Sequence, residues 1–333
     1  MSELERLVNA CLMPAFLGPT VPPWVHDALE DGLAGVCLYG HNLTAPGDDL
    51  PTRDRVRAIG DALRSTRPDV LLALDEEGGD VTRLDYLVGS AYPGNLALGV
   101  VDDVRLTEAV AGAIGADLAA AGVNLNLAPS VDVNSDPRNP VIGVRSFGDD
   151  PALASRHGAA YVRGLQDAGV AAVVKHFPGH GATTVDSHLG LPVVDVDEVT
   201  FRGRELPPFT AAIEAGVAAV MTSHVVFPAL DDEPATLSRR LLVDLLRREL
   251  GFTGVVVTDA LDMAGVRALH GLVGGAVRSL AAGADLLLLG AEDGRDQLGR
   301  IHAAVAERLA AGTLTEERLH EAAGRVAALR ARL

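Results

Sequence analysis

Short runs of apolar residues alternate along the chain with longer segments in which apolar residues recur at helical spacing. The short runs predict eight strands. They are NACLMPAF, GVCLYG, VLLALDEE, NLNLAPSVD, VAAVVKHF, VAAVMTSH, GVVVTDA and ADLLLLG. The longer segments predict helices at 52–66, 106–121, 152–168, 201–215, 238–250 and 266–282, followed by one or two closing helices in 297–333.

Nearly continuous apolar strands that alternate with amphipathic helices predict a parallel sheet with helices on its outer face. Eight strand–helix units of the α/β class predict closure into a single (β/α)8 TIM barrel over residues 1–333. We expect no second domain. An open doubly wound sheet is the alternative.

The charge and the composition exclude several classes of protein. The 45 acidic and 28 basic residues give a net charge of −17, which would repel a nucleic acid backbone. The N-terminal residues lack the basic start and apolar run of a secretory signal, and no stretch has the length of a membrane span. We expect a cytoplasmic monomer that has no nucleic acid or membrane partner and carries Cys11 and Cys37 as buried free thiols.

Polar residues follow the predicted strands at the barrel end where catalytic groups of this fold lie. The third strand leads to Asp75, Glu76 and Glu77, the fifth to Lys175 and His176, the sixth to His224 and the seventh to Asp259. Asp259 could be a helix N-cap. At a strand end it could also be a nucleophile that is held ionised by nearby cations.

Charged residues after neighbouring strands predict a common binding rim. Each hydroxyl of a sugar both donates and accepts a hydrogen bond, so mixed acidic and basic groups suit a carbohydrate ligand. The predicted rim consists of Asp75, Arg83, Arg145, Lys175 and His176.

The segment KHFPGHGATTVDSHLG is rich in groups that could take part in catalysis. A metal site made of His176, His180 and His188 is disfavoured, because their spacing fits no helix face and no ligand cluster completes it. Asp186 could instead orient the His188 ring for proton transfer. Glycines at 179, 181 and 190 suggest that this loop moves over the ligand.

Four segments together resemble the family 3 glycoside hydrolases, specifically the bacterial β-N-acetylglucosaminidases that trim cell-wall muropeptides. They are KHFPGHGATTVDSH, VVVTDALDM, LALDEEGGDVTRL and NPVIGVRSFG. The similarity covers essentially the whole chain, and KHFPGHG followed by DSH is a highly specific signature.

The resemblance implies retaining exo-hydrolysis of terminal β-linked GlcNAc from muropeptides or chitooligosaccharides, without a metal or cofactor. Asp259 would be the nucleophile, and His188, with Asp186 as its partner, the general acid and then the base. This replaces one carboxylate of the usual retaining pair by a histidine. The sugar-binding role would fall on Asp75, Arg83, Arg145, Lys175 and His176.

Two residues differ from the commonest family pattern. Glu76 stands where glutamine is frequent and Asp80 where arginine is frequent. We expect both to add negative charge near the rim and to weaken binding of an anionic muramic acid group.

Three other activities stay open at the level of the sequence. Phosphate could replace water as the acceptor, since a neutral imidazole would not repel it. Lys175 could form a Schiff base, as in barrel aldolases. The chain could also be a sugar-binding barrel that breaks no bond.

Overall fold

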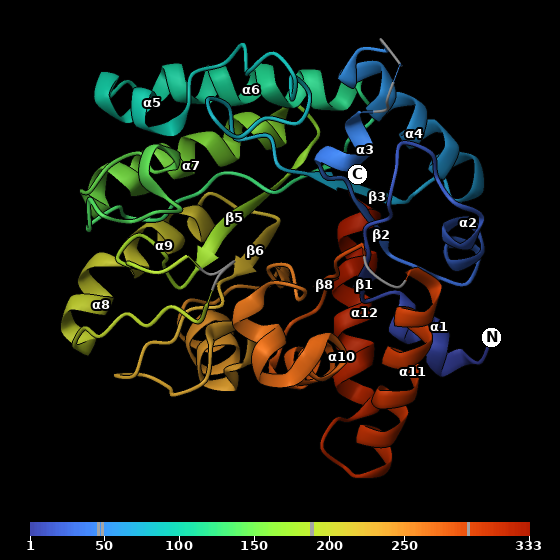
Figure 1. Ribbon diagram of the computed structural model, residues 1–333. Helices are drawn as coiled ribbons and strands as arrows, with labels where there is room; N and C mark the ends of the chain where they lie inside the picture. The colour runs from blue at the N-terminus through green and yellow to red at the C-terminus, as the bar shows by residue number, and fades with distance from the viewer. Residues whose placement is uncertain (45–46, 48–49, 187–189, 292–293) are drawn as a thin grey trace.

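Parallel strands form the centre of the structure, a computed structural model that describes residues 1–333 except 45–46, 48–49, 187–189 and 292–293 (Figure 1). The eight strands among the described residues are those that the sequence predicts. They are β1 (Leu12–Met13), β2 (Gly35–Cys37), β3 (Leu71–Leu74), β4 (Leu125–Asn126), β5 (Ala171–Phe177), β6 (Ala219–Thr222), β7 (Val255–Val257) and β8 (Leu287–Leu288).

Helices connect the strands and lie around them (Figure 1). The α-helices of the first half are α1 (Glu3–Asn9), α2 (Pro23–Glu30), α3 (Gly40–Leu43), α4 (Thr52–Thr66), α5 (Asn95–Val101), α6 (Val104–Ala120) and α7 (Pro151–Asp167). Those of the second half are α8 (Glu198–Arg204), α9 (Leu206–Glu214), α10 (Ala264–Ala282), α11 (Gly294–Ala310) and α12 (Glu316–Arg330). Short 3₁₀ turns occur at η1 (Gly143–Arg145) and η2 (Ala235–Leu237), and η3 (Arg240–Glu249) is π-helical.

The strands pair in the order in which they occur along the chain. β2 to β7 form one parallel sheet of six strands, and β1 pairs with β8. This consecutive order is not that of a doubly wound sheet, which reverses at a switch point. Between the two sheets, Val257 forms a parallel bridge with Leu286, and Cys37 N donates to Pro14 O at 3.1 Å. The predicted α/β class with a parallel sheet is confirmed. The six-stranded sheet has the form of a half-barrel, and one closed barrel of eight strands stays a prediction.

Alternate residues of each strand enter two separate apolar layers. On β3, Leu72 and Leu74 join the larger core, which contains most of the buried helix residues, whereas Leu71 and Ala73 join the smaller one. The smaller layer also contains Val173 of β5. Successive strand side chains point to opposite faces, so both faces of the sheet are buried. This explains why the strands read as continuous apolar runs.

The predicted helix over residues 201–215 is wrong in one respect, because it is two helices. α8 ends at Arg204 and α9 begins at Leu206, with Glu205 between them. The sequence LPPF follows, and proline is favoured in the first turn of a helix but not in its interior. The prolines therefore start a second helix.

Cys11 and Cys37 are buried free thiols, as predicted. In the part of the chain that is described, no helix combines the length and the apolar character that crossing a bilayer requires.

Candidate active site

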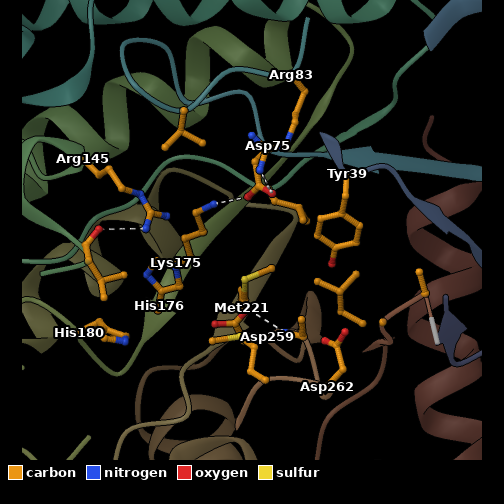
Figure 2. Close-up of a pocket in the computed structure, with 18 of the residues that line it drawn as sticks. Tyr39, Asp75, Arg83, Arg145, Lys175, His176, His180, Met221, Asp259 and Asp262 are labelled. Atoms are coloured by element: carbon orange, nitrogen blue, oxygen red, sulfur yellow. Dashed lines mark hydrogen bonds and ion pairs between the residues drawn. The ribbon is translucent and has the colours of Figure 1, made fainter. Parts of the chain in front are cut away.

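A cavity of about 520 Å³ opens beside the carboxyl ends of the strands. Figure 2 shows charged side chains converging on it from several strands. All five predicted rim residues border this cavity, and the predicted nucleophile does too. These residues are Asp75, Arg83, Arg145, Lys175, His176 and Asp259.

The end of β5 supplies two neighbouring residues to the cavity. Successive strand residues normally point to opposite faces. The ladder between β5 and β6 shifts register between Val174 and Phe177, and an irregularity of this kind redirects side chains. Lys175 and His176 therefore both border the cavity.

Lys175 is buried and lies between two carboxylates. Its Nζ is 2.6 Å from Asp75 Oδ1 and 2.7 Å from Glu77 Oε1. Burial alone would lower the pKa of Lys175, but Asp75 and Glu77 raise it above its ordinary value. Lys175 is therefore a charged donor and not a free amine.

Arg145 and Arg83 extend this charged network. Arg145 binds Glu77 with both ends of its guanidinium, at 2.7 Å from Nη2 to Oε1 and 3.0 Å from Nε to Oε2. Burial alone would raise the pKa of Glu77, but Arg145 and Lys175 hold it well below its usual range. Arg83 Nη2 lies 3.8 Å from Asp75 Oδ2. The network fixes the rim groups in place.

Asp259 follows β7 and is held at its own turn. Its Oδ1 accepts from Ala260 N at 2.8 Å. Burial alone would raise the pKa of Asp259, but the neighbouring His224 and His176 and the Ala260 N–H lower it. The side chain is therefore an ionised carboxylate at neutral pH, as a nucleophile requires.

His224 positions the turn that carries Asp259. It is fully buried after β6, and its Nε2 lies 3.0 Å from Ala260 O. Since a carbonyl oxygen only accepts, Nε2 carries the proton. His224 Nδ1 lies 2.8 Å from Thr236 Oγ1, which fixes the ring.

Asp132 organises the residues that follow β5. Its Oδ2 is 2.7 Å from His176 Nδ1, and its Oδ1 accepts from His180 N at 2.7 Å. His176 N and Ser130 Oγ also donate to it. Two of the three histidines considered as metal ligands thus contact the same buried carboxylate.

The glycines of this loop serve close packing. A Cβ on Gly181 would overlap the carbonyl oxygen of Val133, and one on Gly179 would overlap the carboxyl group of Glu205. Only glycine fits such close approaches. Close packing therefore accounts for Gly179 and Gly181, and the expectation that the loop with glycines 179, 181 and 190 moves over the ligand stays a prediction.

The predicted proton-transfer pair is only partly described. Asp186 is half-buried, and its carbonyl oxygen accepts from Gly190 N at 3.0 Å. Of the described residues, Asp186 is not among those that border the cavity. His188 lies outside the described residues, so the roles of both residues stay predictions.

Glu76 lies near the rim residue Arg83 but does not border the cavity, and its expected effect on an anionic muramic acid group stays a prediction, as does that of Asp80. The Glu76 side chain is buried, and its Oε2 accepts from Thr82 Oγ1, Arg83 N and Leu84 N at 2.8–2.9 Å. Glu76 therefore stabilises the loop after β3. Asp80 is exposed.

Three polar residues with clear positions were not assigned a role from the sequence. They are Glu77, Asp132 and His224. Each follows a strand that was predicted correctly, so its position at a strand end was the available signal. The groups that these residues contact follow other strands, so the spacing of residues along the sequence does not predict the contacts.

With this geometry established, comparisons with known proteins identify the family. Residues 25–329 match the glycosyl hydrolase family 3 N terminal domain. The chain belongs to glycoside hydrolase family 3. The predicted resemblance is thus confirmed.

Among proteins of this family, β-hexosaminidase A of Pseudoalteromonas piscicida is 36% identical over 94% of this chain and 56% of that protein. The structure of a family 3 β-N-acetylglucosaminidase from Paenibacillus sp. str. FPU-7 is 40% identical, with a TM-score of 0.92 over 100% of this chain and 63% of that one. A β-N-acetylhexosaminidase from Beutenbergia cavernae is 33% identical, with a TM-score of 0.86 over 99% of both chains. This chain thus spans less than two thirds of the first two relatives.

Proposed function

We propose that this protein is a retaining exo-β-N-acetylglucosaminidase that releases terminal β-linked GlcNAc through a covalent intermediate on Asp259. Its substrates would be muropeptides or chitooligosaccharides. The observation that carries this proposal is an ionised Asp259 carboxylate at a cavity bordered by paired charged groups. The names of the related β-hexosaminidases support the same activity.

The reaction would proceed in two displacements. Asp259 attacks the anomeric carbon while the bond to the leaving oxygen breaks, and His188 gives that oxygen a proton. Water then attacks the same carbon as His188 takes back a proton, and the ester to Asp259 breaks. The network of Asp75, Lys175 and Arg145 would bind the sugar hydroxyls throughout.

Two observations support this scheme over the other activities. Lys175 is held as an ammonium ion by Asp75 and Glu77, and a Schiff base requires a neutral amine. A protein that only binds sugar does not require a lowered pKa at Asp259.

The parallel bridge between Val257 and Leu286 and the hydrogen bond from Cys37 N to Pro14 O support our inference that the eight strands close into a (β/α)8 barrel.

Covalent labelling tests the proposal. A slowly reacting 5-fluoro derivative of N-acetylglucosaminyl fluoride should add its sugar to the peptide that contains Asp259, as read by mass spectrometry. Asp262, a second carboxylate at the cavity, gives the matched control. Asp262→Asn should still be labelled on Asp259, whereas Asp259→Asn should not be labelled. A label on any other residue contradicts the proposed nucleophile.

A further inference from the structure

Tyr39 brings to the cavity a buried hydroxyl that has no good hydrogen-bond partner. It follows β2 and borders the cavity, and Figure 2 shows its hydroxyl directed toward the part where Asp259 and Asp262 lie. The hydroxyl oxygen is buried, and none of the described residues forms a hydrogen bond of normal geometry with it. It interacts with the Cys37 thiol, which is only a weak partner. A buried hydroxyl of this kind costs free energy in the unliganded protein.

The hydroxyl of Tyr39 is a donor at neutral pH. Burial, and then the nearby Cys37 and Asp75, raise the pKa of Tyr39 well above its ordinary value. The proton therefore stays on the oxygen. A ligand that fills the cavity can accept this hydrogen bond with an oxygen of its own, and a sugar hydroxyl has the lone pairs to do so.

Tyr39 is held in place by its neighbours. Its backbone N–H donates to Asn42 Oδ1 at 2.9 Å, and the Asn42 amide donates to Phe16 O and Gly18 O at 2.7 and 2.8 Å. The ring also stacks on His41, with 6.0 Å between the ring centroids. A group that is fixed in this way loses little conformational freedom when it binds a ligand.

Tyr39 and the charged network lie on different strands of the same sheet. Tyr39 follows β2, Asp75 follows the neighbouring β3, and Lys175 of β5 binds Asp75 at 2.6 Å. All three residues border the cavity. A sugar that binds Asp75 and Lys175 through some of its hydroxyls can therefore present another hydroxyl to Tyr39.

We propose that Tyr39 is a further substrate-binding residue, whose hydroxyl donates a hydrogen bond to one hydroxyl of the terminal sugar. The inference rests on the proposed glycosidase function and deepens it, because it adds the β2 side of the cavity to the groups that recognise the sugar. The hydrogen bond that the free protein lacks is then formed only in the complex. Tyr39 thus favours ligand binding over the stability of the free protein.

Binding of N-acetylglucosamine to the intact chain tests this role without turnover. Tyr39→Phe removes only the hydroxyl, so calorimetry should give roughly fivefold to tenfold weaker binding. Tyr86→Phe is the matched control, because the Tyr86 hydroxyl lies against Gly40 and Tyr86 is not among the described residues that border the cavity. Its affinity for N-acetylglucosamine should equal that of the unmodified protein.

Deoxy sugars identify the hydroxyl that Tyr39 contacts. The 3-, 4- and 6-deoxy derivatives of N-acetylglucosamine each lack one hydroxyl. One of them should bind Tyr39→Phe and the unmodified protein with equal affinity, because the group that Tyr39 would contact is absent. If all three derivatives bind the variant as much more weakly as N-acetylglucosamine does, Tyr39 contacts no sugar hydroxyl and the proposal is overturned.

Thermal unfolding separates a binding role from a structural one. Without ligand, Tyr39→Phe should unfold at the same temperature as the unmodified protein or at a higher one, because no good hydrogen bond is lost. Excess N-acetylglucosamine should raise the melting temperature of the variant by less than that of the unmodified protein. A lower melting temperature of the free variant, or its failure to fold, would show a structural role and overturn the proposal.

The binding measurement also distinguishes this inference from the proposed function. Unchanged affinity of Tyr39→Phe for N-acetylglucosamine would overturn the inference alone. If the unmodified protein did not bind N-acetylglucosamine at all, the proposed function would fail, and the inference with it.

Discussion

Two buried carboxyl groups hold the turn after β5 from different sides. Asp132 accepts from the backbone of His176 and His180, and Glu205 packs against Gly179. Burial opposes ionisation of both, but the neighbouring His176 lowers the pKa of Asp132 to about 2. Arg204 is the cationic neighbour of Glu205 among the described residues, and burial raises the pKa of Glu205 to about 7. The two groups should therefore respond to pH in opposite ways.

Asp132→Asn should destabilise the protein at neutral pH, because the amide cannot accept from both backbone N–H groups and His176. The ionised carboxylate contributes roughly 2 kcal/mol to the free energy of unfolding above pH 4. This contribution is lost as the pH falls through about 2, because the folded state lowers the pKa of Asp132. The substitution should remove this acid dependence. Urea unfolding between acidic and neutral pH measures it, with exposed Asp195→Asn as the control. Equal stability of Asp132→Asn and the unmodified protein at pH 7 would contradict the role.

Glu205→Gln should flatten the pH dependence of stability near neutrality. Because the folded state raises the pKa of Glu205 from 4.5 to about 7, its contribution is complete below pH 4.5 and is lost as the pH rises through about 7. Over this pH range the unmodified protein should lose roughly 3 kcal/mol of its free energy of unfolding, whereas the glutamine variant should not. Exposed Glu214→Gln on the following helix is the control. The assignment fails if Glu205→Gln and the unmodified protein lose the same stability between pH 5 and pH 8.

At the residue scale, the sequence identifies which residues stand at strand ends but not which way they point. Glu76 and Glu77 are adjacent and chemically identical, yet Glu76 binds the loop at 82–84 and Glu77 binds Arg145. Strand geometry sends neighbours in opposite directions, but the direction depends on the sheet register. That register is set by tertiary pairing, which local sequence does not record.

At the scale of elements, the apolar pattern predicts the strands well and the helices less evenly. All eight strands lie where they were predicted, because both of their faces are buried. The predicted helix over 52–66 agrees with α4 at both ends. The single helix over 201–215 is instead broken at Glu205, which was predictable from the prolines that follow.

The proposed acid/base role belongs to the loop that contains Asp186 and His188. His188→Ala should reduce turnover of glycosides with poor leaving groups by about a hundredfold or more, since their oxygen needs a proton to depart. Activated aryl glycosides should lose much less. Parallel kcat/KM measurements on 4-nitrophenyl β-GlcNAc and chitobiose test this role. Equal losses on the two substrates would argue against it.

At the scale of the whole molecule, the candidate chemistry and a major structural contact lie at opposite ends of the strands. The cavity lies at the carboxyl ends of the strands, whereas Asp285 lies two residues before β8 and binds Arg247, Arg318 and Arg325. Arg318 and Arg325 belong to α12, so this buried carboxylate ties the last helix to the sheet. This separation agrees with barrel enzymes, in which one face serves stability and the other catalysis.

The central claim is that Asp259 forms a glycosyl ester, which water then opens by attack from the face of the sugar that the aglycone has left. Proton NMR of the first minutes of hydrolysis of 4-nitrophenyl β-GlcNAc tests it most directly, before the product mutarotates. Two successive inversions predict that β-GlcNAc appears first and the α anomer follows only by mutarotation. Appearance of α-GlcNAc as the first product would contradict the account.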